Sequence, residues 1–534
     1  MNMIPVPELV LGFSDAENYK RRENKDLLNK IFVRTRTLEK LCDHNTNFLI
    51  GEKGTGKTAY AVFLANNDYN NHLASLRYIR ETEYQKFVSM KRARNLSLSD
   101  YSDVWKVIIY LLLAQQVRER ESKMPLLGDL GKFNALNSAI DEYYQNAFSP
   151  EIIYAIQFAE ESKRAAEILA KYLSVGAKVG SENKVSTTFS ESHFQVNLRY
   201  IQKSFEDAFR ALKLTRNHIL FIDGIDIRPS SIEYNDYLEC VKGLANAVWN
   251  VNNDFFANIK DSKGRLRVVL LVRPDIFTSL GLQNQNNKIR DNSAVLSWLT
   301  TYPEYRNSDL FLVTDRLLSS QQKGDLPPGM TWDYYFPYDA PEVESRQRHR
   351  SAFISFLRFS LYRPRDIVTI LSIQKENFIE QGRGASEVFS ADDFTNPAFT
   401  RKYSDYILGE VKDHMAFYHT SERYELFLKF FQYLQGHQRF TYQEFLSAFE
   451  AYGKFLKANV KDMPPFCETP DIFLQFLYDL NVICFVEDTN DKPFFGWCYR
   501  ERTPSNIAPK VKSNVRYNVH YGLTKAVDLG KHFR

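Results

Sequence analysis

Short apolar runs alternate with amphipathic segments through the first half of the chain. FLI at 48–50, ILFI at 219–222 and an apolar run at about 267–273 have the length of buried strands. Apolar residues at helical spacing follow the first run, in TAYAVFLANN. Buried strands that alternate with helices are typical of a parallel sheet covered by helices. We therefore predict an α/β domain with a parallel sheet in this half.

The second half reads as helical, with 321–342 interrupting the pattern as a loop. Thr441 and Glu444 form a capping box before one amphipathic helix, and Thr469 with Pro470 begins another. The apolar stripe predicted for this second helix comprises Ile472, Phe473, Phe476, Leu477 and Leu480.

Two alternating segments, ICFVED and PFFGWCYRER, follow these helices around TNDK and predict a hairpin. Two helices followed by a hairpin is the order of a winged helix. The predicted organisation is therefore a lead-in at 1–45, an α/β core at 46–299, a helical lid at 300–399 and a helical and winged-helix-like domain at 400–534. The core carries an insertion at about 120–200, where a helix at 152–173 precedes a polar loop.

The composition is that of a globular protein. Of 534 residues, 44% are hydrophobic and 25% charged, and the 40 Phe and 31 Tyr favour aromatic cores over a base-stacking surface. Five cysteines without a CxxC pair predict free thiols in a reducing compartment. A zinc site of Cys467, Cys484, Cys498 and His520 is a weaker alternative, because short ligand spacing is absent.

The length of the apolar runs and the distribution of charge bear on partners. VIIYLLLA, the longest apolar run near the middle, is far shorter than the roughly 20 residues of a membrane span. The first residues lack a basic region typical of a signal peptide, so we expect no membrane association and a cytoplasmic location.

The net charge is +4, but 500–534 holds eight basic and two acidic residues, with Tyr499, Tyr517 and Tyr521 interleaved. This composition suits contact with nucleic-acid phosphates or a solvated protein-facing edge.

The clearest chemical motif follows the first strand. GEKGTGKT at 51–58 matches GxxxxGK[ST], a loop that cradles phosphates between a strand and a helix. Its glycines allow backbone N–H groups to point inward, and the helix N-terminus favours an anion. We expect Lys57 to reach the β- and γ-phosphates and the Thr58 hydroxyl to ligate Mg²⁺. The predicted nucleotide-binding residues are Gly51, Glu52, Lys53, Gly54, Thr55, Gly56, Lys57, Thr58 and Ala59.

An acid at the end of the second strand completes the predicted metal site. Asp223 ends HILFID, and ligands gather at the carboxyl ends of strands in a parallel sheet. We predict that Asp223 holds Mg²⁺ through a water molecule. The guanine-binding pattern NKxD is not met in NNKIRD, because Arg290 stands at the position of its Asp. This favours ATP over GTP.

The segment DGID resembles the Walker B motif of STAND-type ATPases, AAA+-related switch proteins that include NACHT modules. The resemblance implies an ASCE/AAA+-like P-loop core, and that Asp226 orients or activates the attacking water. The family often has a further acid where this chain has Ile227, a departure that argues for slow hydrolysis.

Three groups of arginines resemble other parts of such sites. Arg273, after the third strand, resembles a sensor 1 arginine that touches the γ-phosphate; a surface arginine is the alternative. LYRPRD resembles a sensor 2 region, which implies that Arg363 or Arg365 reaches the nucleotide, and solvated helix-start residues are the alternative. Arg290 and Arg306 are candidates for an arginine finger supplied to a neighbouring subunit.

Two functions compete on this evidence. The first is an ATP-binding switch with slow hydrolysis that controls its own assembly, as a homo-oligomer, or a separate effector protein. The chain looks like bacterial P-loop ATPases of this kind, and several such groups are encoded in antiphage defence loci. The second is a nucleic-acid-stimulated motor or loader that uses the winged helix. A small-molecule kinase is a weaker third reading, because it leaves the lid and the winged helix without a role.

Overall fold

A computed structural model describes residues 3–79, 98–121, 131, 133–145, 191–340, 351–384, 387–488, 493–503 and 506–530. The chain divides into two compact units. The sheet unit comprises Thr37–Ile50 and Tyr60–Val295, and the helical unit comprises Met1–Arg36, Gly51–Ala59 and Leu296–Arg534. The helix predicted at 152–173 lies outside the described residues, as does most of the polar loop after it.

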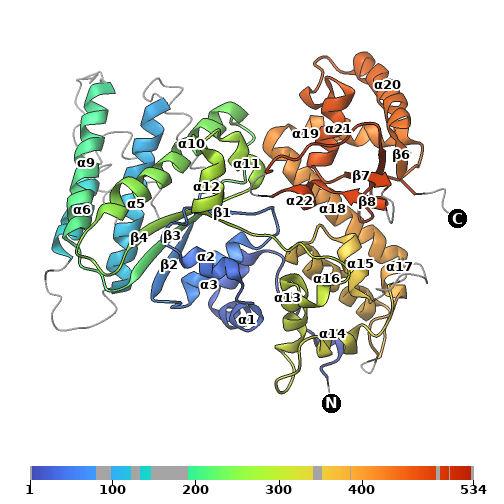
Figure 1. The fold of residues 1–534 in the computed structure, drawn as a ribbon, viewed down its shortest axis with the longest axis horizontal. Coiled ribbons are helices and arrows are strands. Elements are labelled where there is room, and N and C mark those ends of the chain that lie inside the picture. The colour runs from blue at the N-terminus through green and yellow to red at the C-terminus, as the bar shows by residue number, and fades with distance from the viewer. Residues whose placement is uncertain are drawn as a thin grey trace, which may run out of the picture. The chain divides into compact units, whose positions relative to one another are not determined.

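The sheet unit is built on a five-stranded parallel sheet of order β2-β3-β4-β1-β5. Strands β1 to β4 are labelled in Figure 1. Its strands are β1 Phe48–Ile50, β2 His72–Tyr78, β3 Asn217–Asp223, β4 Leu266–Val272 and β5 Ser293–Val295. Every residue of β1 and β4 is buried, as expected for strands covered on both faces. The predicted parallel sheet is confirmed, and the three strands expected from the sequence are β1, β3 and β4.

Helices pack on this sheet because it has apolar side chains on both faces, and α6 and α9 pack on one another and on α5. The helices are α2 Arg36–Cys42, α3 Lys57–Asn66, α5 Leu98–Glu121, α6 Asn134–Gln145, α9 Glu191–Ala211, α10 Tyr234–Asn250, α11 Pro274–Ser279 and α12 Gln285–Asn292. In α5, the Gln116 amide donates to the carbonyls of Leu73 and Ile219 at 3.1 and 3.2 Å, which ties the helix to β2 and β3. The apolar run VIIYLLLA is the buried middle of α5.

The helical unit has a run of helices after residue 300, as predicted. They are α13 Asp309–Ser319, α14 Met330–Tyr335, α15 Phe353–Phe359, α16 Pro364–Glu380, α17 Asp392–Thr395 and α18 Pro397–Tyr418, with α1 Lys25–Ile31 from the N-terminal part. The expectation of a loop throughout 321–342 was wrong, because α14 lies within it. Trp332 of α14 is fully buried and stacks on Phe336 with ring centroids 4.1 Å apart. This burial stabilises a helix that its Gly- and Pro-rich surroundings conceal in the sequence.

The C-terminal part has the predicted winged-helix order. It comprises α19 Ser421–Lys429, β6 Arg439–Thr441, α20 Tyr442–Asn459, α21 Pro470–Asp479, β7 Ile483–Asp488, β8 Pro493–Gly496, α22 Cys498–Glu501 and β9 Arg516–Val519. The capping box at Thr441 and the Thr469 cap are both present. Strands β7 and β8 are antiparallel, but β8 ends at Gly496, earlier than the sequence suggested. Strand β9, which was not predicted, pairs between β6 and β7.

Aromatic side chains fill the core of this part. Phe430 and Phe473 meet with ring centroids 4.7 Å apart, and Phe445 and Tyr452 surround them. The abundance of Phe therefore reflects core packing here, as predicted. Ile472, assigned to the apolar stripe of α21, is instead 42% exposed, so the buried face of that helix starts at Phe473.

The cysteines and the longest helices bear on the expectations of free thiols and of no membrane span. All five cysteines are free thiols, four of them buried. Across the described ranges, no helix combines the length and apolarity needed to cross a bilayer.

Candidate functional site

The loop between β1 and α3 has the conformation that its glycines permit. Gly54 and Gly56 have φ angles of +85° and +92°, which side-chain-bearing residues rarely adopt. A Cβ on Gly51 would lie 2.5 Å from the Thr55 hydroxyl, so a larger residue there would displace the loop. The Trp298 indole donates to the Thr55 carbonyl at 2.8 Å. Trp298 and residues 51–59 both belong to the helical unit, so this bond restrains the loop within that unit.

Lys57 lies at the first position of α3 and is buried. Its ammonium donates to the carbonyls of Gly51 at 2.9 Å and Glu52 at 3.4 Å. A cation is therefore held over the loop, beside the helix N-terminus, where an anion is electrostatically favoured. Thr58 follows in the same first turn and is partly exposed. The N–H groups of the glycine loop and the Lys57 ammonium are the donors that a triphosphate requires. The Thr58 hydroxyl is a ligand that Mg²⁺ accepts.

Asp223 ends β3, as predicted. It lies at the same carboxyl edge of the sheet as Ile50, the residue before the glycine loop, with β4 between the two strands. Its carboxylate accepts the Gly224 N–H at 2.8 Å and is almost fully buried. Gly224 has a φ of +94°, and a Cβ there would lie 2.5 Å from the Ile79 carbonyl. This close approach explains why glycine follows the aspartate.

Asp226 and Arg273 also follow strands at this edge. Asp226 lies in the turn after β3 and is partly buried, whereas the adjacent Ile227 is 64% exposed. Arg273 follows β4, is 1% exposed and donates from Nε to the Asp275 carboxylate at 3.0 Å. The alternative of a surface arginine is therefore wrong. Asp223, Asp226 and Arg273 thus follow neighbouring strands of one sheet, and their roles toward a nucleotide stay predictions.

The two lid arginines contact the glycine loop directly. Arg363 precedes α16 and donates to the Lys53 carbonyl at 2.8 Å. It also forms a bidentate pair with Asp366. The backbone N–H of Arg365 approaches the Gly54 carbonyl at 3.3 Å, and its side chain donates to the Ser14 carbonyl at 3.0 Å. Arg363 is 6% exposed, so the alternative of a solvated side chain is wrong for it.

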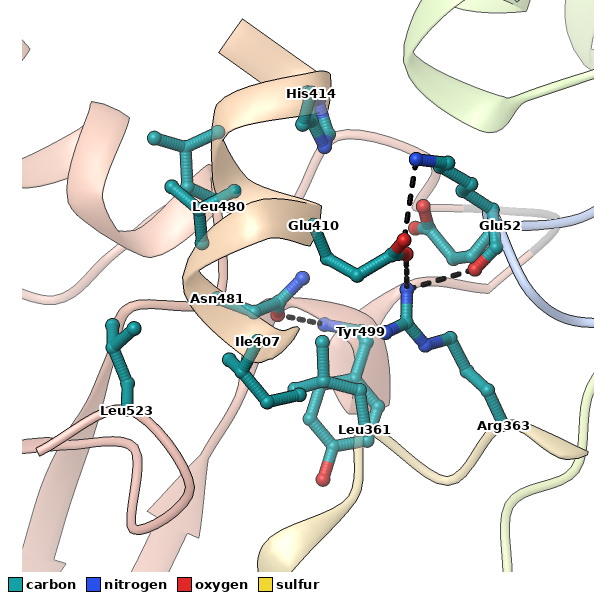
Figure 2. Close-up of a pocket in the computed structure, with 12 residues that line it drawn as sticks. Glu52, Leu361, Arg363, Ile407, Glu410, His414, Leu480, Asn481, Tyr499 and Leu523 are labelled. Carbon is teal, nitrogen blue, oxygen red and sulfur yellow. Dashed lines mark hydrogen bonds and ion pairs between the residues drawn. The ribbon is translucent and has the colours of Figure 1, made fainter. Parts of the chain in front are cut away.

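Glu410 of α18 is the centre of a charge cluster at this loop. It pairs with Arg363 at 3.2 Å (Figure 2). It also pairs with Lys53 at 3.2 Å and Arg365 at 3.6 Å, and Lys53 reaches Asp413 at 2.6 Å. Burial alone would raise the pKa of Glu410, but the charges of Arg363, Lys53 and Arg365 outweigh it and lower the pKa. Glu410 therefore stays ionised. We call Lys53, Arg363, Arg365 and Glu410 the loop–lid cluster.

The C-terminal basic segment also reaches the loop. Arg502 forms an ion pair with Glu52 and is largely buried, which lowers its pKa to about 10. Arg500 contacts the Tyr362 hydroxyl, and Lys512 and Arg516 pair with Glu487 and Asp488. Four of the basic side chains in this segment are thus engaged within the chain.

The two candidate arginine fingers each pair with a carboxylate of this chain. Arg290 pairs with Asp291 at 2.9 Å, and Arg306 donates to Asp333 at 3.0 Å. No group of three or more His, Cys, Asp or Glu residues in the described part of the chain is placed to hold a metal ion, so the zinc alternative has no support.

Sequence reasoning missed the acidic partners of this site. Glu410 and Asp413 are more than 350 residues from Lys53, and nothing in their local sequence marks them. The Arg502 contact was hidden as well, because a basic segment was expected to face outward. Asp366 could have been found: it follows Arg363 at a spacing of three, within the first turn of a helix whose start the sequence predicts.

Comparisons with known proteins identify no family. No protein-family model matches the chain, and no curated protein matches it. Among solved structures, the ORC1 protein of Aeropyrum pernix in complex with DNA aligns over 94% of this chain and 91% of its own, with 12% identity and a TM-score of 0.35.

Proposed function

We propose that this protein is a Mg²⁺-dependent ATP-binding switch that hydrolyses ATP slowly. Gly51–Ala59 would hold the triphosphate, with Lys57 on the β- and γ-phosphates. Thr58 and Asp223 would hold the Mg²⁺ ion, which when bound neutralises phosphate charge. Asp226 would position the attacking water and Arg273 would sense the γ-phosphate. Support comes from the glycine conformations, the buried lysine and the placement of the three strand-end residues at one sheet edge.

The observation that carries the switch proposal is the loop–lid cluster. Residues 52–54 would bind phosphate through their N–H groups. The same residues contact other parts of the helical unit, because Glu52 pairs with Arg502, Lys53 pairs with Glu410, and the Gly54 carbonyl accepts from the Arg365 N–H. A rearrangement of this loop on nucleotide binding would therefore alter its ion pairs with Glu410 and Arg502. Pairs with such buried partners are sensitive to small displacements, because an unpaired buried charge is costly.

The finer parts of the proposal rest on the resemblance of DGID to STAND-type ATPases. They are that the protein assembles into a homo-oligomer or controls a separate effector protein, that it is cytoplasmic, and that it acts in bacterial antiviral defence. The exposed Ile227, at a position where such proteins often carry an acid, supports slow rather than rapid turnover.

A nucleic-acid-stimulated motor remains the second candidate, supported by the winged-helix order of α20, α21 and the β7–β8 hairpin. The pairing of Arg502, Lys512 and Arg516 within the chain weakens it, because these are three of the eight basic residues that the sequence places in this segment.

ATP turnover and molecular mass together separate the two functions. For the switch, we expect slow turnover that is unchanged by DNA or RNA at two salt concentrations. Light scattering should show a change in mass with a slowly hydrolysed ATP analogue. Strong, salt-sensitive stimulation by nucleic acid would instead establish the motor, because phosphate contacts weaken with salt.

The loop–lid cluster gives a separate prediction. Glu410→Gln preserves the shape of the side chain but removes the charge that holds Lys53, Arg363 and Arg365. If the cluster restrains the loop, we expect ATP turnover to rise by about tenfold, the equivalent of one lost charge-assisted interaction. The matched control is Asp405→Asn, an exposed carboxylate on the same helix. Unchanged turnover with only a lower melting temperature would show that the cluster is purely structural.

A further inference from the structure

A cavity in the helical unit lies outside the site described above. Its volume is about 500 Å³ including its open mouth, and it lies between the end of α15 and strands β8 and β9. The lining residues are Tyr302, Leu357, Arg358, Tyr362, Phe495, Trp497, Tyr499, Arg500, Asn518, His520 and Tyr521. None of them belongs to the glycine loop or the loop–lid cluster.

Aromatic rings dominate the walls of this cavity. Tyr362 and Tyr499 meet edge to face with centroids 5.7 Å apart, and Trp497 packs against the His520 ring at 5.1 Å. These contacts fix the rings in place. A planar aromatic ligand that enters such a cavity can stack on preorganised π-faces without the cost of ordering them.

Two guanidinium groups supply the charge. Arg500 lies over the Tyr362 ring at 4.6 Å and Arg358 over the Tyr521 ring at 5.8 Å. Burial lowers the pKa of His520 to about 4, so that ring is neutral at pH 7. Among the lining residues that the structure describes there is no carboxylate. The cavity therefore combines aromatic faces with two permanent positive charges.

We propose that this cavity binds a nucleobase that carries a phosphate, either as a free mononucleotide or as one residue of a single-stranded nucleic acid. The base would stack among Tyr362, Trp497 and Tyr499. Arg358 and Arg500 would hold the phosphate, since guanidinium groups match phosphate oxygens. Asn518 offers an amide to the edge of the base. An aromatic cation, the other common ligand of aromatic cavities, is disfavoured by the two arginines.

The binding test uses thymidine ligands on the Lys57→Ala variant. That variant removes the lysine proposed for phosphate binding in the glycine loop, and thymidine avoids the adenine preference of that site. Thymidine monophosphate, a thymidine decanucleotide and inorganic phosphate are titrated by calorimetry. We expect the monophosphate or the decanucleotide to bind at least about tenfold more tightly than phosphate, because stacking adds to charge. Equal binding of the two thymidine ligands indicates a free mononucleotide, and tighter binding of the decanucleotide indicates a single strand.

Variants then assign the binding to this cavity. Arg358→Gln should weaken binding by about tenfold through loss of one charge-assisted contact. Trp497→Phe should remove the ligand-induced change in tryptophan fluorescence. Arg401→Gln, on an exposed arginine of α18, is the control and should bind as the parent does. The proposal is wrong if neither thymidine ligand binds, if phosphate alone binds equally well, or if Arg358→Gln has no effect. Because the parent lacks Lys57, these outcomes do not depend on whether the glycine loop binds ATP.

Discussion

Replacing Lys57 by Ala should reduce the affinity for ATP by at least about a hundredfold. The ammonium would make charge-assisted bonds to two phosphates, each contributing roughly 1.5–3 kcal/mol, and about 1.4 kcal/mol corresponds to tenfold in affinity. The structure supports this expectation because Lys57 is buried and is held over the loop by the Gly51 and Glu52 carbonyls. Calorimetric titration with ATP and Mg²⁺ measures the effect.

Two controls make the Lys57 result interpretable. The variant should melt as the wild type does, within a few degrees, because the bonds that Lys57 donates to the Gly51 and Glu52 carbonyls lie within one loop and its first helical turn. Lys454→Ala, on an exposed lysine of α20, should bind ATP normally. If Lys57→Ala bound ATP as wild type does, residues 51–58 would not be the phosphate site.

Asp223→Asn should separate binding from turnover. The amide oxygen can still accept the Gly224 N–H, so the turn after β3 should survive. Loss of the carboxylate should weaken the metal site, and we expect ATP turnover to fall by about a hundredfold or more while ATP affinity falls by about tenfold or less. Steady-state phosphate release and calorimetry measure the two quantities. Asp254→Asn, on an exposed carboxylate of the sheet unit, should leave both unchanged. Turnover equal to wild type would exclude Asp223 from the metal site.

Elements whose signals are local could be predicted from the sequence. β1, β3 and β4 each contain a short run of consecutive apolar residues, and the starts of α16, α20 and α21 are marked by Pro or by capping residues. The glycine loop was recognised for the same reason. Its residues lie next to one another in the chain, and their spacing follows from the geometry of a bound phosphate.

Features decided by distant contacts could not be predicted. β9 is recognised as a strand only by its pairing with β6 and β7, and α14 is stabilised by the burial of Trp332. The burial of Arg273 depends on the packing around β4, which the sequence does not reveal. Glu410 and Arg502 reach the loop only because the chain folds back from more than 300 residues away. In this site the glycine loop and the lid arginines were visible in the sequence, whereas their partners Glu410 and Arg502 were not.

The proposal depends above all on Thr58 and Asp223 holding one Mg²⁺ ion on one triphosphate. A double-mutant cycle measures this directly, using the affinity of a slowly hydrolysed ATP analogue with and without Mg²⁺ for wild type, Thr58→Ala, Asp223→Asn and the double variant. If both residues act on one ion, each single change should reduce the gain in affinity that Mg²⁺ provides. The double variant should then lose little more of this gain than the more impaired of the two single variants does. Independent, additive losses, or a gain that either variant retains in full, would contradict the proposal.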